Sequence, residues 1–520
     1  MNVAAERGTF CLVLHTHLPW LARAGTWPVG EEWLYQAWAQ SYLPVVSLLR
    51  RLGDAGRRDV LTLGVTPVVA AQLDDPYCLR QFHQWLGDWQ VRASGLAPRL
   101  PAAAAYEFAS ATHALREFET RWQHGAAPVL RELVDADVVE LLGGPLTHPF
   151  QPLLDDAIAR FALHSGLDDA LLRLGRRTPG IWAPECAYRP GLESLYADAD
   201  VSHFMLDGPT LIGGRRDSVQ PSRRLHDPDA TADAWFVGDS DVIAFGRDLS
   251  VSYLVWSPRR GYPGGRHYRD FHTFDHPSGF RVARVTSVQT EPDAKRPYEP
   301  ERAAHAVRAD AAHFVDAVWT RLDDLAARRD GRAGLVVCAY DTELFGHWWH
   351  EGPQFLELVL HRLPEVGVRV TTLRGALETH AAAGRVYPGP GSWGSGKDWH
   401  VWDGELVADV AAESGRVQKE LLDVVSTLAP RRARRPDLDQ LCREGLLALA
   451  SDWAFMVTKD AAPDYARRRF ADHVARFRRL TSAIGAGRGH EVAAELAVFD
   501  GPFGHLDARN LWHDRSSCAR

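Results

Sequence analysis

The stretch TFCLVLHTH, residues 9–17, decides the fold, because its apolar run stops abruptly at His15 and His17. Other short apolar runs also end at polar or ionisable residues. They are Val60–Val65, Val138–Leu142, Gly180–Ala183, His203–Leu206 and Leu335–Ala339. Runs rich in Val, Leu and Ile are typical of strands that are buried on both faces of a parallel sheet. The sequence therefore predicts parallel strands that carry polar side chains at their carboxyl ends.

Stretches with helical apolar spacing lie between these runs, among them Glu31–Leu52, Ala104–Asp135 and Pro300–Arg328. Alternation of strands and helices, with chemistry at the strand ends, predicts an α/β fold of the TIM-like barrel type. A doubly wound open sheet is the main alternative. Neither GxGxxG nor GxxxxGK[ST] follows a predicted strand, however, so the barrel is favoured.

Two breaks in composition divide the chain. The polar segment 213–234 reads as a surface loop or an active-site lid, and the Gly-rich segment Pro388–Lys397 reads as a linker. After the linker, residues 405–428, 438–456 and 463–484 show helical spacing. We therefore expect a catalytic domain over residues 1–385 with an inserted loop or helical subdomain. A linker over 386–404 and a C-terminal helical domain over 405–520 follow it.

The composition excludes several classes of protein. The chain has 520 residues, of which 46% are apolar and 24% charged, as in folded globular proteins. A formal net charge of −8 argues against a nucleic-acid partner. The six cysteines form no CxxC pair, which favours reduced thiols in a cytoplasmic protein. The chain contains no run of 18 apolar residues, which argues against a membrane partner.

Carboxylates follow two of the predicted strands. Glu185 comes directly after the run Gly180–Ala183 and Pro184, and Asp341 follows Leu335–Ala339 and Tyr340. A charged group in such a place must be paired or lie in a solvated cleft. One interpretation is a strand-end glutamate bonded to an arginine. The other is a pair of carboxylates across a glycosidic bond, one as nucleophile and one as acid/base.

The histidines allow more than one interpretation. His15 and His17 share one face of an extended strand, and with an aspartate they could bind zinc. They could equally hydrogen-bond a substrate hydroxyl or orient a carboxylate. His148, after the segment GGPLT, either faces the same cleft or is a satisfied core histidine.

The chain is rich in tryptophan, with 18 residues. Trp393, Trp399 and Trp402 lie in or beside the Gly-rich linker, where a core role is least natural. Their flat faces suit stacking on sugar rings, and packing at a hinge is the alternative.

Four ordered motifs resemble the conserved regions of glycoside hydrolase family 57, especially its α-1,4-glucan branching enzymes. They are HTHLPW (15–20), GGPLTHPF (143–150), IWAPECAY (181–188) and YDTELFGHWW (340–349). The stretches WPVGEEW (27–33), VWSPRRGYPG (255–264) and residues 451–477 are also similar to that group.

This resemblance implies a distorted (β/α)7 barrel with a helical insertion and a C-terminal helical domain. It implies that Glu185 is the nucleophile and Asp341 the general acid/base. Other residues that it assigns to substrate binding are His15, His17, His148, Trp27, Trp256, Trp393 and Trp402. It implies neither a metal nor a cofactor.

The resemblance also implies the reaction, a retaining cleavage of α-1,4 links and transfer to a 6-hydroxyl that forms α-1,6 branches. The partners are then α-1,4-glucan donor and acceptor chains. Alternatives within the family are an α-amylase-like hydrolase or a 4-α-glucanotransferase. Alternatives from other classes are a metal-dependent polysaccharide deacetylase or a non-catalytic glucan-binding protein. Branching members carry a lid tyrosine, whereas no tyrosine occurs here between Tyr196 and Tyr253, which predicts a larger share of hydrolysis.

Overall fold

The computed structural model describes residues 7–27, 29–216, 228–257, 261–287, 289–428 and 433–511. Seven parallel strands form its core, in the order β9-β1-β2-β3-β4-β5-β8. Their bounds are β1 Gly8–Thr16, β2 Leu61–Val65, β3 Val139–Gly143, β4 Gly180–Ile181, β5 His203–Leu206, β8 Ile243–Gly246 and β9 Gly334–Asp341. Six of these strands coincide with the predicted apolar runs, whereas β8 was not predicted. The order of the seven agrees with the expected seven-stranded barrel.

The barrel is distorted where it closes. The outer edge of β8 pairs with the antiparallel strand β7 (Ala234–Val237) instead of with β9. The seam to β9 is bridged by the backbone bond from Asp248 N–H to Val337 O, 2.8 Å long. Three further strands complete the sheet. They are β6 Arg215–Arg216, β10 Val368–Thr371 and β11 Arg385–Tyr387.

Side chains fill the barrel interior, as the pleat requires. Alternate residues of β1 and β9 point inward and pack together, namely Cys11, Val13, Leu335, Val337 and Ala339. Leu142, Met205 and Phe245 from other strands meet them. The opposite faces of the strands contact the surrounding helices and belong to the larger apolar core. The barrel is therefore a packed core, and the strand ends are left to carry the chemistry.

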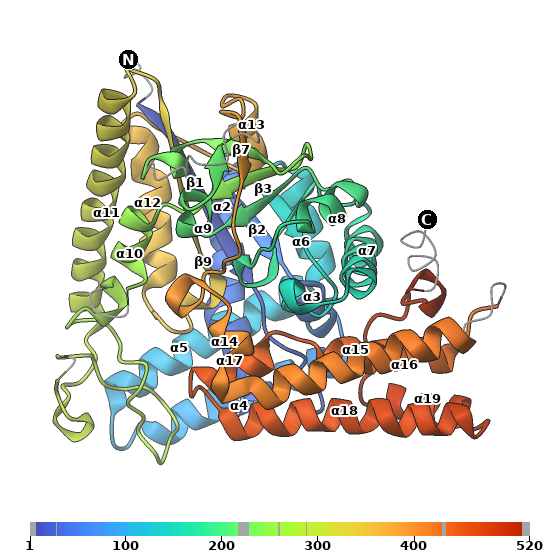
Figure 1. The fold of residues 1–520 in the computed structure, drawn as a ribbon. Helices are drawn as coiled ribbons and strands as arrows, with labels where there is room; N and C mark the ends of the chain where they lie inside the picture. The colour runs from blue at the N-terminus through green and yellow to red at the C-terminus, as the bar shows by residue number, and fades with distance from the viewer. Residues whose placement is uncertain are drawn as a thin grey trace.

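Helices surround the barrel (Figure 1). They are α1 Glu31–Ala37, α2 Leu43–Asp54, α3 Pro67–Leu73, α6 Ala126–Asp135, α7 Asp156–Leu174, α8 Leu192–Asp198, α9 Gly208–Ile212, α10 Leu249–Val255, α11 Pro300–Arg328, α12 Gly352–Glu365 and α13 Leu373–Leu377. The inserted hairpin consists of α4 Pro76–Leu96 and α5 Pro101–Glu117, which pack on each other. The helix predicted over 104–135 is two helices, because Gly125 takes a positive φ of 91° between them.

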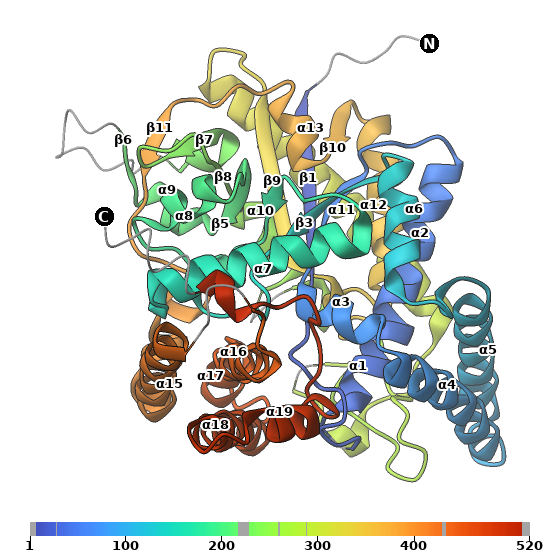
Figure 2. The same cartoon turned by 90° about the vertical axis from the view of Figure 1, so that its right-hand side faces the viewer.

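The C-terminal helices lie across the carboxyl ends of the strands (Figure 1), and Figure 2 shows α15 to α19 gathered below α7. They are α14 His400–Asp403, α15 Ala408–Leu428, α16 Pro436–Ala448, α17 Asp452–Thr458, α18 Pro463–Gly485 and α19 Gly489–Ala497. The predicted helix 438–456 is broken between α16 and α17. None of the described helices is long and apolar enough to cross a membrane.

Two predicted segments need comment. Residues 217–227 of the predicted lid 213–234 lie outside the described residues. The predicted linker 386–404 is not a free connection, because its first residues belong to β11. Lys397 further anchors it, since its Nζ lies 2.8 Å from Asp207 Oδ2 and donates to Trp393 O.

Candidate active site

The predicted polar residues meet at the carboxyl end of the barrel. His15 lies in β1 and is paired in register with Asp341, the last residue of β9. His17 follows β1, His148 lies in the loop after β3, and Glu185 lies just after β4. Because parallel strands present their carboxyl ends at one face, residues far apart in the sequence are brought to one site.

Glu185 stands on a strained turn. Its φ is 61°, and that of Cys186 is 47°, so two consecutive non-glycine residues take the left-handed conformation. His148 also has a positive φ, of 57°. Such residues cost about 1–3 kcal/mol each and persist where the surrounding structure holds them, commonly at functional sites. The fold thus holds Glu185 in a costly backbone conformation just after β4.

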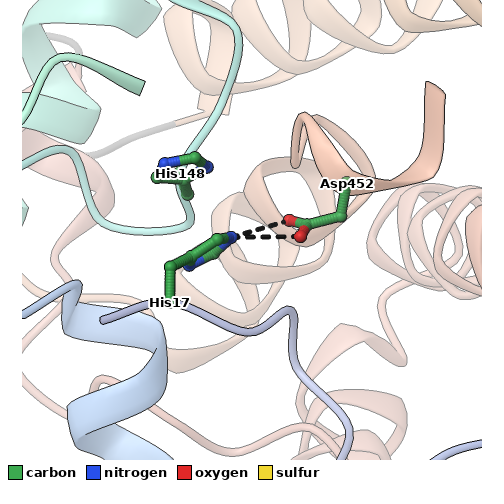
Figure 3. A group of neighbouring side chains, drawn as sticks. All are labelled: His17, His148 and Asp452. Carbon is green, nitrogen blue, oxygen red and sulfur yellow. Dashed lines mark hydrogen bonds and ion pairs between the residues drawn. The ribbon is translucent and has the colours of Figure 1, made fainter. Parts of the chain in front are cut away.

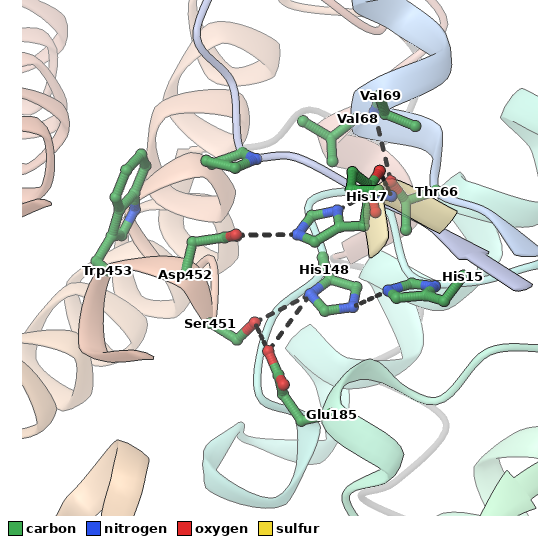
Figure 4. Close-up of polar contacts among 12 residues, drawn as sticks. His15, His17, Thr66, Val68, Val69, His148, Glu185, Ser451, Asp452 and Trp453 are labelled. Carbon is green, nitrogen blue, oxygen red and sulfur yellow. Dashed lines mark hydrogen bonds and ion pairs between the residues drawn. The ribbon is translucent and has the colours of Figure 1, made fainter. Parts of the chain in front are cut away.

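Two side chains donate hydrogen bonds to the Glu185 carboxyl. Trp393 Nε1–H donates to Oε2 at 2.8 Å. The Ser451 hydroxyl donates to Oε1 at 2.7 Å (Figure 4). Burial raises the pKa of Glu185 to about 7, although the bonds from Ser451 and Trp393 oppose that rise. The carboxyl is thus poised to change its charge near neutral pH.

Asp341 lies among other ionisable groups. Burial raises its pKa to about 6, and His17 and Arg247 partly oppose the rise. Its neighbour Glu343 accepts hydrogen bonds from Tyr42 Oη at 2.5 Å and from the backbone N–H of His17 at 3.1 Å. Burial, together with Asp341, raises the pKa of Glu343 to about 8. Asp341 therefore sits beside a carboxyl that stays protonated at neutral pH, and it can itself exchange a proton near pH 6.

The three histidines differ in charge. Burial alone would lower the pKa of His17, but Asp452 raises it. The Asp452 carboxylate oxygens lie 3.1 Å from His17 Nε2 (Figure 3). Burial and the nearby His17 lower the pKa values of His15 and His148. His17 is thus the member of the group that most readily carries a positive charge, whereas burial favours the neutral form of the other two imidazoles.

The described residues placed as metal ligands differ from the pair that the sequence suggested, because His148 takes the place of His15. His17, His148 and Asp452 each offer a ligand atom, and these atoms lie within 4.8 Å of one another. The rings of His17 and His148 are stacked, however, with centroids 3.7 Å apart and planes inclined by 24°. Imidazole lone pairs lie in the ring plane, so the two stacked rings direct them along planes that are 3.7 Å apart at the centroids and inclined by only 24°. They do not converge on one ion at the roughly 2.0–2.1 Å that zinc requires.

Comparison with known proteins identifies the family. The sequence profile described as glycosyl hydrolase family 57 matches residues 11–388, and that of the 1,4-alpha-glucan branching enzyme C-terminal domain matches residues 415–511. This chain belongs to glycoside hydrolase family 57. A probable 1,4-alpha-glucan branching enzyme of Mycobacterium tuberculosis is 50% identical over 542 positions, covering 98% of this chain and 100% of that protein.

More distant proteins are similar to this chain in sequence or in fold. A 1,4-alpha-glucan branching enzyme of Thermococcus kodakarensis is 32% identical, over 92% of this chain and 74% of that protein. The crystal structure of a branching enzyme of this family from Pyrococcus horikoshii matches with a TM-score of 0.88 at 29% identity, covering 97% of each chain. The α-amylase AmyC of Thermotoga maritima matches with a TM-score of 0.84 at 23% identity, which shows a shared fold.

The four tryptophans expected to bind glucan in this family 57 protein lie in different surroundings. Trp27 and Trp256 are exposed, by 63% and 45%, and Trp256 stacks on Trp348 with centroids 5.7 Å apart. Trp393 contacts the predicted nucleophile directly. The prediction that Trp402 binds glucan is wrong, because this side chain is buried and stacked on Phe150 with ring centroids 4.4 Å apart. Its face is covered by the core, so it offers no platform to a sugar.

Sequence reasoning missed several residues of the site. Ser451 and Asp452 come from the C-terminal helical domain, and Tyr42 and Arg247 come from the barrel. The stretch 451–477 resembles branching enzymes in sequence. That resemblance was the available signal for Ser451 and Asp452, but it did not indicate where these side chains point.

Proposed function

We propose that this protein is a retaining α-1,4-glucan branching enzyme, with Glu185 as nucleophile and Asp341 as general acid/base. The observation that carries the proposal is the Glu185 carboxyl, held on a strained turn by two donors at the same barrel mouth as Asp341. The branching-enzyme relatives, similar over nearly the whole chain, support the choice of reaction.

In the first step, Asp341 protonates the glycosidic oxygen while the Glu185 carboxylate attacks the anomeric carbon. The α-1,4 link breaks, the leaving chain takes the proton, and a glycosyl-enzyme forms. In the second step, Asp341 removes the proton from the 6-hydroxyl of an acceptor glucan, and that oxygen displaces Glu185. The product is an α-1,6 branch, and both carboxyl groups return to their starting states.

The pH dependence follows from these roles. Activity requires Glu185 ionised and Asp341 protonated, and the two groups have pKa values of about 7 and about 6. Rates therefore fall at low pH because Glu185 gains a proton, and at high pH because Asp341 loses one. We expect kcat/KM to follow a bell with its maximum at about pH 6.5, midway between the two.

Water can replace the acceptor in the second step, which gives hydrolysis in place of branching. The lack of a tyrosine between Tyr196 and Tyr253 favours a share of hydrolysis. Incubation with amylose tests the assignment, by counting α-1,6 linkages formed against reducing ends released. Branch points as the main product support the proposal. Reducing ends without branch points would instead indicate an amylase-like hydrolase. Turnover that produces neither branch points nor new reducing ends would indicate a 4-α-glucanotransferase.

The exposed tryptophans supply a sharper version of this assay. If Trp256 stacks on an acceptor glucan, Trp256→Ala weakens acceptor binding by about 1–2 kcal/mol and lowers branching more than total cleavage. The buried Trp402 is the matched control. Trp402→Ala should reduce both products in equal proportion, through a loss of stability.

The proposed partners are α-1,4-glucan donor and acceptor chains, without nucleic acid or membrane. We place the protein in the cytoplasm, in keeping with its scattered cysteines. The described ones, Cys11, Cys78, Cys186, Cys338 and Cys442, are free and buried.

A further inference from the structure

Ser451 occupies the break between α16 and α17 and is fixed there by the barrel. Its backbone N–H donates to His148 O at 3.0 Å, and Ala450 forms a β-bridge with Pro149. Thr147 Oγ1 donates to Leu446 O at 2.7 Å. The loop after β3 thus holds the serine at a defined place over the nucleophile.

The hydroxyl of Ser451 has one proton to donate and two neighbours. Its Oγ lies 2.7 Å from Glu185 Oε1 and 2.9 Å from His148 Nδ1 (Figure 4). An ionised carboxylate can only accept a hydrogen bond. The serine proton therefore points to Glu185, and the serine oxygen accepts a hydrogen bond from His148 Nδ1–H.

The direction of the serine proton also determines which nitrogen of His148 carries a proton. A neutral imidazole carries one N–H, so His148 with its proton on Nδ1 has a bare Nε2. That atom lies 3.1 Å from His15 Nε2, which must then carry the proton and donate. His15 Nδ1 is left bare, and it is buried without a hydrogen-bond partner among the described residues. A bare acceptor is tolerated there more easily than an orphaned N–H.

We propose that His15, His148 and Ser451 form a hydrogen-bond chain whose donors all point toward Glu185 and stabilise its ionised form. Ser451 is the positioning residue through which the C-terminal helical domain acts on the nucleophile. The proposal rests on the proposed function, which makes Glu185 the nucleophile.

Other groups also face Glu185 and form the background to this effect. His17 from the segment after β1 favours the ionised carboxylate, and Asp452 from α17 opposes it. Trp393 donates to the other carboxyl oxygen, and the buried thiol of Cys186 is adjacent. None of these contacts passes through Ser451, and neither does the direct approach of His148 Nδ1 to Glu185 Oε1 at 3.9 Å. Substitution of the serine therefore removes only the link through its hydroxyl.

The experiment compares Ser451→Ala with Ser451→Thr, which keeps a hydroxyl. At low pH the rate is proportional to the small ionised fraction of Glu185, whereas at high pH that group is fully ionised in every variant. We expect Ser451→Ala to lower kcat/KM about tenfold at pH 5, because the pH at which Glu185 ionises should rise by about one pH unit. At pH 9 the kcat/KM of the variant should stay near the wild-type value. Ser451→Thr should restore the low-pH rate.

A loss of activity in Ser451→Ala that is equal at all pH values would overturn the chain and leave only a structural role for the serine. An absence of glucan turnover in the wild type would instead contradict the proposed function. Imidazole ¹⁵N shifts of the wild type are a second readout, independent of activity and of how the variants fold. They should show His148 protonated on Nδ1 and His15 on Nε2, and the reverse tautomers would also overturn the proposal.

Discussion

Histidines and carboxylates meet at both ends of this barrel, but the pKa of the carboxyl group is lowered at one end and raised at the other. At the amino end, His203 Nε2 lies 2.8 Å from Glu140 Oε1, and Thr62 Oγ1 and Arg374 N–H donate to Oε2. Burial would raise the pKa of Glu140, but His203 and these bonds hold it below its ordinary value. At the carboxyl end, burial dominates and raises the pKa of Glu185 to about 7 and that of Asp341 to about 6.

The difference separates a structural group from a reactive one. Glu140 has partners for its negative charge and stays ionised at neutral pH, so it serves the fold. Glu185 accepts two hydrogen bonds, but the imidazole 3.9 Å from its carboxyl belongs to His148, in which burial favours the neutral form. Glu185 is also held on a strained turn. An incompletely stabilised carboxylate can attack a carbon or exchange a proton, at a cost to stability.

The largest expected effect is on activity at the carboxyl end. Glu185→Gln cannot form the covalent intermediate, so we expect glucan turnover to fall by about 10⁴-fold or more while circular dichroism stays unchanged. Glu140→Gln should retain the wild-type rate per folded molecule. A Glu185→Gln variant with nearly wild-type activity would show that the two ends have been assigned the wrong roles.

The next effect is on stability at the amino end. Glu140→Gln removes a buried negative charge that accepts hydrogen bonds from Thr62 and Arg374 N–H and lies against His203, and we expect it to lower the free energy of unfolding by about 3 kcal/mol. Urea denaturation measures this loss. The matched control is Glu357→Gln, which removes a half-exposed carboxylate paired with Arg51 and should leave the urea midpoint unchanged. Equal changes of the urea midpoint in the two variants would contradict the structural role of Glu140.

The pH dependence of stability should have opposite signs at the two ends. The raised pKa of Glu185 means that the folded protein loses stability as pH rises from about 4.3, the unfolded value, to about 7. Glu185→Gln escapes this loss, so its advantage over wild type should grow by about 3 kcal/mol across that window. The depressed pKa of Glu140 gives stability above about pH 4.3 that is lost as pH falls. Urea midpoints at pH 5 and pH 8 test the sign for Glu185, and midpoints at pH 3 and pH 6 test the sign for Glu140. A difference from wild type that does not change across its own pH window would contradict the assignment of that residue.

The smallest expected effect is that of chelation. Because the stacked rings of His17 and His148 do not converge on one point, we expect EDTA to leave branching activity unchanged. The protein as purified should contain no stoichiometric zinc by elemental analysis. One zinc per chain, with activity lost on its removal and restored on its return, would revive the metal-dependent alternative.

The fold was largely predictable from the sequence, since apolar runs report burial directly. The helix predicted over Pro300–Arg328 coincides with α11. The helix predicted over 438–456 breaks at residues 449–451, although Leu449, Ala450 and Ser451 are compatible with a helix. The break accompanies a tertiary contact, the bridge of Ala450 to Pro149, which helical periodicity cannot report.

The site was predictable only in part, for the same reason. Glu185 and Asp341 were placed at one end of the barrel because strand ends can be read along the chain. Ser451 and Asp452 join them from a domain that packs against the barrel mouth. The Gly-rich sequence around Trp402 suggests an exposed tryptophan that could stack on a sugar. Its stacking on Phe150 depends on how two segments far apart in the sequence meet, which the local sequence does not report.

The central claim, that Glu185 forms a covalent bond to the sugar, is tested most directly by trapping that bond. Asp341→Asn should still be glycosylated by an α-maltosyl fluoride, because fluoride leaves without acid assistance, but deglycosylation lacks its base and the intermediate accumulates. Peptide mass spectrometry after a short incubation should find one maltosyl unit on the peptide that contains Glu185. A sugar attached to another residue, or none while fluoride is released at the wild-type rate, would contradict the account.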